Sequence, residues 1–296
     1  MQSLSRHLPW NDRRGGFDPL RLAAFALVAA PGVRIGWGLA SEAVAADPVE
    51  AALHRAGDWA VYLLVATLAV TPLRRLLAWP PLATVRRMLG VAAFCYAAAH
   101  LALYLIDQGG DIALAAGEIV GRFYLTVGFV ALLGLGVLAA TSFDAAIRRL
   151  RRNWKRLHAA VYPLAALTLV HFFLQSRADV GEPVLCAGLF AGLMLHRLPV
   201  LRRLPGGSEA AIVVVAVLAA LATAAIEYAW YATMTGLPAD RVLLANLDLR
   251  FRIGPMWTVL AAMAAPLPLR LLLNGLRARR RRLAEPAIGA ARRNRA

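Results

Sequence analysis

The sequence predicts an all-α protein, a polytopic bundle of membrane-spanning helices. Hydrophobic residues make up 60% of its 296 residues, against ~45–50% in typical soluble domains. Charged residues make up 17%, below the usual ~25%, and the mean hydropathy is +0.59. Apolar segments of about 20 residues alternate with short charged links, which is the pattern of helices that cross a bilayer.

Eight segments are long and apolar enough to be spans, at about residues 20–40, 54–71, 88–106, 123–141, 157–175, 183–200, 209–231 and 255–275. The first has an alternative interpretation as a signal peptide cleaved near residues 43–46, although Arg34 interrupts its apolar stretch. The seventh carries Glu227 beside aromatic residues that are typical of an outer membrane interface. The eighth contains Pro266 and Pro268, so we expect it to be kinked.

The links between the spans alternate in charge. Basic residues crowd the links at 74–75, 86–87, 148–156, 197–203 and 277–282, and acidic residues occupy those at 42–50, 107–118, 179–182 and 240–248. The positive-inside rule then places both termini in the cytoplasm, in agreement with an even number of spans. The net charge of +16 therefore reflects membrane topology and contact with lipid, and we expect no nucleic-acid partner.

Two histidines are predicted to lie at the same depth in the membrane. His100 lies roughly 20 Å along the third span from Arg87, and His171 about 22 Å along the fifth span from Arg156. Two facing imidazoles on helices of a bundle are what a b-type haem requires. Zinc prefers three or four ligands, and besides His100 and His171 the only candidate for a third ligand is His54.

A second haem closer to the cytoplasm is a separate question. His158 precedes His171 on the same span by about 20 Å, but an ideal helix leaves the two rings about 140° apart. Pro163 lies between them and can alter the twist. His196, near the inner end of the sixth span, is either the partner of His158 or only a helix-end imidazole at the interface. The number of haems, one or two, stays open.

The histidines stand within a series of motifs that is specific to one family. The motifs are Asp47-Pro48, His54, Gly57, Trp59-Ala60, residues 68–73 (LAVTPL), 86–90 (RRMLG), 99–101 (AHL), 122–128 (RFYLTVG), 141–142 (TS), 154–158 (WKRLH), 161–162 (VY) and 170–172 (VHF). In this order they resemble the ferric-reductase-like transmembrane family, and within it the MsrQ (YedZ) subfamily. The resemblance covers about residues 47–203.

The resemblance implies a domain organisation and a set of cofactor residues. It implies an N-terminal tail and first span at 1–46 and a haem-binding core at 47–203, which together give six helices. Residues 204–296 then add two spans and a basic tail beyond the usual six. The haem histidines of the family fall on His100, His158 and His171. Larger relatives carry another histidine on the third span, where this chain has Arg86 and Arg87.

The resemblance also implies a function in the bacterial inner membrane. Subunits of this type pass electrons through haem b from quinol or a cytoplasmic flavin reductase to a periplasmic molybdopterin subunit, MsrP-like, that reduces methionine sulfoxide. One alternative is a ferric or cupric reductase that acts on metal at the outer face, and another is a permease whose histidines relay protons. The sequence has no GxGxxG fingerprint or P-loop, so nothing predicts NAD(P)H binding, and we expect no internal repeat.

Two basic features have a functional and a simpler interpretation. Arg122, at the outer edge of the fourth span, either pairs with haem propionates or marks the interface. The inner run at 148–156 either docks an acidic flavoprotein or the phosphate of a flavin such as FMN, or sets topology and meets anionic lipid.

Overall fold

The structure, a computed structural model, describes residues 8–11, 15–41, 47–176, 179–203, 207–250 and 252–277. In these ranges the chain is helical between its links, with one isolated β-bridge between Asn11 and Phe17. The prediction of an all-α bundle is therefore confirmed. Residues 43–46, where the alternative cleavage site was placed, lie outside the described residues.

Helices of full membrane length alternate with short ones. In chain order they are α2 Pro19–Ser41, α3 Pro48–Leu76, η1 Pro80–Thr84, α4 Arg86–Asp107, α5 Ile112–Gly121, α6 Phe123–Ala140, α7 Asp144–Leu150, α8 Arg152–Ala159, α9 Val161–Ser176, α10 Gly181–Leu195, α11 Pro199–Arg202, α12 Gly207–Trp230, the π-helical turn η2 Tyr231–Thr235, α13 Ala239–Leu247 and α14 Pro255–Ala264. Within the described ranges, 7 helices are long and apolar enough to cross a bilayer.

The sixth expected span is shorter than the sequence predicted. The helix α10 has 15 residues, which at ~1.5 Å per residue is shorter than the ~30 Å hydrocarbon core. Pro199 explains the early end, because the residue before a proline is pushed out of the helical region, and Leu198 is extended. The last span is interrupted at Ala265, directly before Pro266, and then continues to Arg277, in agreement with the expected kink.

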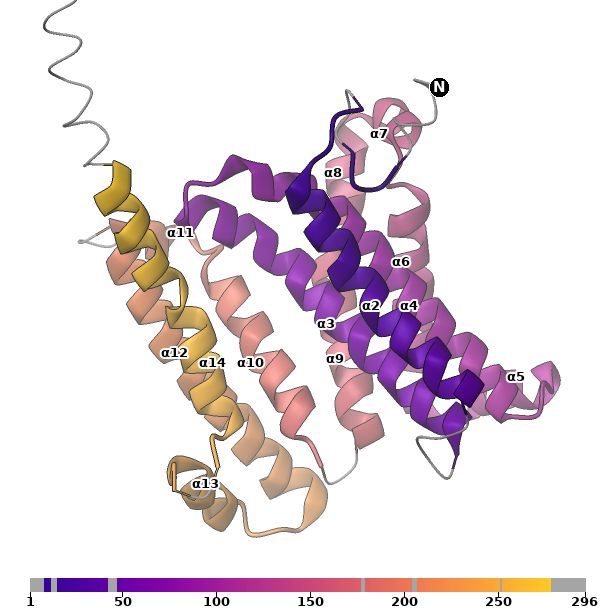
Figure 1. Ribbon diagram of the computed structural model, residues 1–296. Helices are drawn as coiled ribbons and strands as arrows, with labels where there is room; N and C mark the ends of the chain where they lie inside the picture. The colour runs from indigo at the N-terminus through magenta and orange to yellow at the C-terminus, as the bar shows by residue number, and fades with distance from the viewer. Residues whose placement is uncertain are drawn as a thin grey trace, which may run out of the picture.

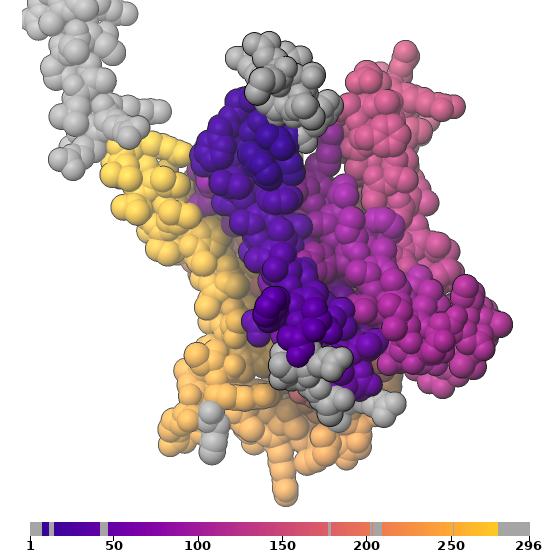
Figure 2. Space-filling view, turned by 45° about the vertical axis from the view of Figure 1, so that its right-hand side comes forward, coloured from indigo at the N-terminus to yellow at the C-terminus, as the bar shows by residue number. Residues whose placement is uncertain are grey.

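Two helical hairpins form the part of the bundle that carries the motifs. The first hairpin is α3 packed against α4, and the second is α6 packed against α9 (Figure 1). The helix α2 lies on the outside of the first hairpin, against α3 and α4 (Figure 2). In the first hairpin α4, which carries His100, runs beside α3. In the second hairpin α9, which carries His171, runs beside α6.

The two ends of the bundle differ in charge. One end, the arginine-rich end, carries the links around α7, α8 and α11, and the opposite, acidic end carries α5 and α13 (Figure 1). The described chain begins and ends at the arginine-rich end (Figure 1).

The helices α12 and α14 pack closely on α10. An added Cβ at Gly188 would lie 2.9 Å from Val259, and one at Gly192 would lie 2.6 Å from Met263 and 3.0 Å from Ala219. Glycines four residues apart let helix backbones approach closely in a membrane. The last two spans therefore cover the face of α10 that points away from the two hairpins (Figure 1).

Arginines tie the first hairpin to the helices that follow it. Pro72 has no N–H to offer the carbonyl of Leu68 one turn earlier, and the Arg197 guanidinium donates to that carbonyl instead, at 2.7 Å. Arg270 donates to the Leu76 carbonyl at 2.5 Å and also bonds Glu209 of α12. The end of α3 is thus capped by cations, which the helix dipole favours.

A candidate cofactor site between two histidines

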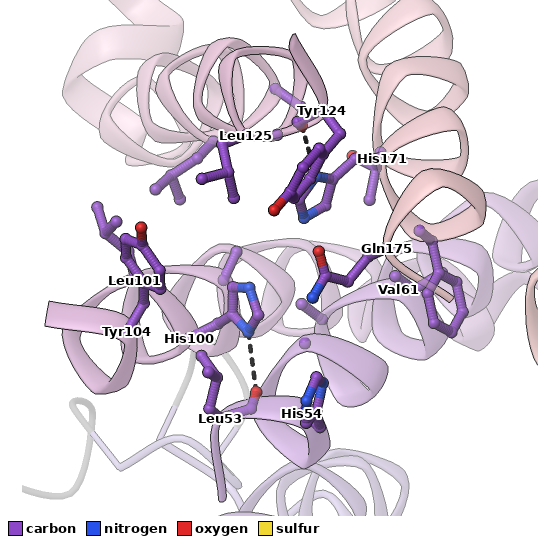
Figure 3. A pocket seen from close by; sticks show the side chains of 18 of the residues that line it. Leu53, His54, Val61, His100, Leu101, Tyr104, Tyr124, Leu125, His171 and Gln175 are labelled. Atoms are coloured by element: carbon purple, nitrogen blue, oxygen red, sulfur yellow. Dashed lines mark hydrogen bonds between the residues drawn. The ribbon is translucent and has the colours of Figure 1, made fainter. Parts of the chain in front are cut away.

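A cavity lies between the two hairpins of the bundle. It measures ≈ 630 Å³, within the range of ~300–1,000 Å³ that is usual for ligand and cofactor sites. Its walls come from α3, α4, α6 and α9, with residues of α5 and α10 at the acidic end. His100 from α4 and His171 from α9 turn into it from opposite sides (Figure 3).

The His100 ring is held by the facing helix α3. Its Nδ1 lies 2.8 Å from the carbonyl oxygen of Leu53. One helical turn later on α3, Gly57 leaves room for the ring, because a Cβ there would lie 2.9 Å from Nδ1. A side chain at this position would push the imidazole away from the carbonyl that orients it.

The His171 ring is held in the same way by α6. Its Nδ1 lies 2.8 Å from the carbonyl oxygen of Tyr124, and a Cβ at Gly128 would lie 2.6 Å from that nitrogen. In both hairpins the carbonyl and the histidine are 47 residues apart in sequence. The same arrangement of carbonyl, glycine and histidine therefore occurs in both hairpins.

These hydrogen bonds decide which nitrogen of each ring is available. A carbonyl oxygen only accepts hydrogen bonds, so Nδ1 must be the protonated nitrogen of His100 and of His171. The lone pair then lies on Nε2, and both rings turn that nitrogen into the cavity (Figure 3). A metal-binding histidine commonly donates its other N–H to a backbone carbonyl, which fixes the ring and makes it a better ligand.

The distance between the rings suits one metal ion shared by both. The ring centroids of His100 and His171 are 6.4 Å apart. Two imidazoles that bind one ion at bond lengths of about 2 Å have their ring centres about 6 Å apart. The pair and the surrounding cavity therefore fit a tetrapyrrole iron with two axial histidines.

The rim of the cavity at the acidic end is polar. Arg122 lies there, 2.7 Å from Glu118 and within hydrogen-bond distance of the Tyr124 hydroxyl. The hydrogen bond to Tyr124 and the charge of Glu118 raise the pKa of Arg122, so the guanidinium stays charged. His54 also lines the rim, is exposed, and lies 3.8 Å from Glu50.

The structure does not bring His158 to this cavity. Its Nε2 lies 3.1 Å from the Thr141 hydroxyl, and its ring stacks on Trp154 at 4.0 Å between centroids. The Trp154 indole donates to the Thr141 carbonyl at 2.9 Å. Within the described residues no ring contact joins His158 to His196, which ends α10. The assignment of His158 as a haem ligand stays a prediction from the sequence.

Several residues of the site had no role assigned to them from the sequence, although Gly57 and the segment 122–128 belong to the motifs of the resemblance. They are the holding carbonyls of Leu53 and Tyr124, the glycines Gly57 and Gly128, and the cavity residues Tyr104 and Gln175. The signal that would have found the first four is the equal spacing from each carbonyl and glycine to its histidine. Backbone carbonyls leave no trace in residue type, so a search for ligands by side chain passes over them.

Comparison with known proteins gives a consistent family. The family model described as "Ferric reductase like transmembrane component" matches residues 56–169. A Xanthomonas campestris protein named "Protein-methionine-sulfoxide reductase heme-binding subunit MsrQ" is 45% identical over 181 residues, which are 59% of this chain and 83% of the relative. A Rhodospirillum rubrum protein of the same name is 40% identical over 190 residues, 63% of this chain and 91% of the relative. No solved structure matches the chain.

The similarity extends over most of the length of these relatives. The chain therefore belongs to the MsrQ family.

Proposed function

We propose that this MsrQ-family protein is a haem b electron-transfer subunit that delivers electrons to a methionine sulfoxide reductase on the outer side of the inner membrane. The observation that carries the proposal is the facing pair His100 and His171, with both Nδ1 atoms fixed by carbonyls and both rings turned into one cavity. The names of the relatives, which describe heme-binding subunits of this reductase, agree with that site.

The residues of the chain would hold the cofactor and set its environment. His100 and His171 would bind the haem iron through their Nε2 atoms, while the carbonyls of Leu53 and Tyr124 keep each ring in place. Haem held by two imidazoles supplies a one-electron Fe(III)/Fe(II) couple. The apolar lining toward the arginine-rich end, from residues such as Ala131, keeps water out and lowers the dielectric constant around the metal.

The direction of transfer follows from the charges of the two ends. By the positive-inside rule the arginine-rich end is cytoplasmic, as are both termini. The histidine pair lies toward the other end of α4 and α9, so electrons would leave on the periplasmic side. The rim there carries the carboxylates Glu50, Asp107 and Glu118, which can steer a basic patch of a redox partner.

The donor and the acceptor come from the family resemblance. The acceptor is a periplasmic molybdopterin subunit of the MsrP type, and the donor is a quinol or a cytoplasmic flavin reductase that meets the arginine-rich end. A basic surface of this kind suits an acidic flavoprotein or anionic lipid.

Deleting the gene tests the proposal against its alternative. Repair of periplasmic methionine sulfoxide should be lost, while the soluble reductase keeps its activity with artificial electron donors. Restoring the wild-type chain should restore repair, and restoring His100→Ala should not. Normal repair in the deletion strain, with reduction of ferric iron lost instead, would favour a metal reductase acting at the outer face.

A further inference from the structure

Two polar side chains lie one helical turn beyond the histidines, toward the acidic end. Tyr104 follows His100 on α4 and Gln175 follows His171 on α9, each by one turn and on the same helix face as its histidine. Both line the cavity and both point into it (Figure 3). The two hairpins thus place a hydrogen-bonding side chain at equivalent positions on opposite walls.

Neither side chain is satisfied by the protein. The Tyr104 hydroxyl is buried and has no hydrogen-bond partner in the described part of the chain. The Gln175 carboxamide makes no hydrogen bond to any described residue, although it lies in the wall of the cavity. A buried polar group without a partner is destabilising, so the Tyr104 hydroxyl needs a ligand or water as its partner. The Gln175 side chain is exposed, so it carries no such cost, but its carboxamide is free to bind a group in the cavity.

The two directions out of the cavity differ in polarity. One turn from the histidines toward the arginine-rich end, the lining consists of Ala97, Leu132, Leu135 and Thr168, whose hydroxyl already bonds the Leu164 carbonyl. Toward the acidic end the lining contains Tyr104, Gln175 and several carboxylates. A disc-shaped cofactor with one apolar edge and one carboxylate edge would therefore turn its carboxylates toward the acidic end.

The charged residues at the rim are mostly acids, which cannot stabilise the carboxylates of a cofactor. Arg122 lines the cavity, but its charge is already paired with Glu118, which lies 2.7 Å from it. The other charged groups there are mostly acids, namely Glu50, Asp58, Asp107, Asp179 and Glu182. The carboxylates of a cofactor need hydrogen-bond donors that bring no further negative charge, and a phenol and a carboxamide meet that need.

We propose that Tyr104 and Gln175 donate hydrogen bonds to the propionate edge of the haem held by His100 and His171. The inference rests on the proposed function, since it assumes haem in this cavity. It assigns Tyr104 and Gln175 to cofactor retention, and it fixes the orientation of the macrocycle, with its propionates toward the periplasm.

The test compares haem with its propionate dimethyl ester in the full-length protein. Purified wild type, Tyr104→Phe and Gln175→Met are mixed with excess apomyoglobin, and haem loss is followed by absorbance. Tyr104→Phe should lose haem roughly tenfold faster than wild type, because a hydrogen bond to a charged acceptor is lost. Gln175→Met should show a smaller acceleration. After reloading with the dimethyl ester, in which the propionates are blocked, the variants should match wild type.

Tyr96→Phe is the matched control, because Tyr96 lies on the same helix but donates to the Val28 carbonyl at 2.7 Å, outside the cavity. It should release haem at the wild-type rate. Equal acceleration of haem and ester loss in Tyr104→Phe would overturn the proposal, because it would show a role in cavity shape alone. Wild-type protein that binds neither compound would overturn the proposed function as well.

Discussion

The two hairpins of the core hold their histidines identically and differ in almost everything around them. In both, Nδ1 lies 2.8 Å from a carbonyl 47 residues earlier, and a glycine one turn beyond the carbonyl admits the ring. At the arginine-rich end they diverge. The first hairpin has Arg87, 2.7 Å from Asp144, whereas the second is preceded by α8, on which His158 stacks on Trp154.

The features that both hairpins share are those that hold the histidines, and the features in which the hairpins differ are not needed for holding them. The repeated part is the backbone register, with one carbonyl and one glycine in each hairpin. The varied part is the set of side chains at the arginine-rich end, together with the bracing of α3, whose end is capped by Arg270 and Arg277 of the last span. The two hairpins should therefore respond alike to substitutions at the histidines and differently to substitutions elsewhere.

Removing either histidine should have the largest effect. If the hairpins are equivalent, His100→Ala and His171→Ala should each reduce bound haem by more than about tenfold or leave it five-coordinate, because each deletes one of two axial ligands. The measurement is haem per protein by pyridine haemochrome, together with the spin state from the Soret band. Full retention of low-spin haem in one variant would assign the ligand on that hairpin to another residue.

A methyl group on either holding glycine should weaken the site less than loss of a ligand. Gly128→Ala places a Cβ 2.6 Å from Nδ1 of His171, and Gly57→Ala places one 2.9 Å from Nδ1 of His100. Overpacking of this kind typically costs about 1–3 kcal/mol, so we expect weaker haem retention, more so for Gly128→Ala.

The comparison for the glycine variants is Gly117→Ala on α5, where an added Cβ has no neighbour within 4 Å. This control should behave as wild type in haem content and rate of haem loss. Retention as strong in Gly128→Ala as in Gly117→Ala would show that the ring does not need its carbonyl.

Loss of the last two spans should affect the first hairpin more than the second. No residue beyond Pro183 lines the cavity within the described chain, so a chain ending at residue 203 should still bind haem. It would lose the arginine caps of α3 and uncover Gly188 and Gly192 of α10, and its melting temperature should fall by several degrees. Compared with wild type, the truncated chain should show faster amide hydrogen exchange at the end of α3 and unchanged exchange in α6. A truncated chain that folds but binds no haem would show that the last spans help to form the cofactor site.

Substitution of His158 should have the smallest effect on the haem between His100 and His171. Its ring contacts are Trp154 and Thr141, which do not line the cavity. His158→Ala should therefore keep the low-spin signal of that haem, and any haem lost would belong to a separate site. Disappearance of all haem in this variant, in protein that is still folded, would show that the two levels are not independent.

The sequence predicted the bundle and the approach of His100 to His171, but not how the two rings are held. The helices follow from apolar length and charged links, which are local properties. The approach of His100 and His171 followed from equal helix depth, since both spans start at arginines. The holding contacts depend on backbone carbonyls of another helix, and carbonyls are present at every residue, so residue types do not indicate them.

The structure differs from the sequence-based expectation in two further features, the length of α10 and the burial of Glu227. Pro199 ends α10 early, although apolar residues continue on both sides of it. Glu227 lies in the last turn of α12, near that end of the span as expected, but it is buried and accepts a hydrogen bond from Asn246 of α13 at 2.7 Å. That pairing needs α13 to fold back on the end of α12, which no periodicity in the sequence indicates.

The absorbance spectrum of the purified wild-type protein, oxidised and after dithionite, tests the central claim most directly. Two axial imidazoles on one iron should give a low-spin b-type spectrum with a sharp α band on reduction, and pyridine haemochrome should identify haem b. A preparation that is folded but lacks haem, or one whose haem is high-spin and five-coordinate, would contradict the assignment of His100 and His171 as a ligand pair.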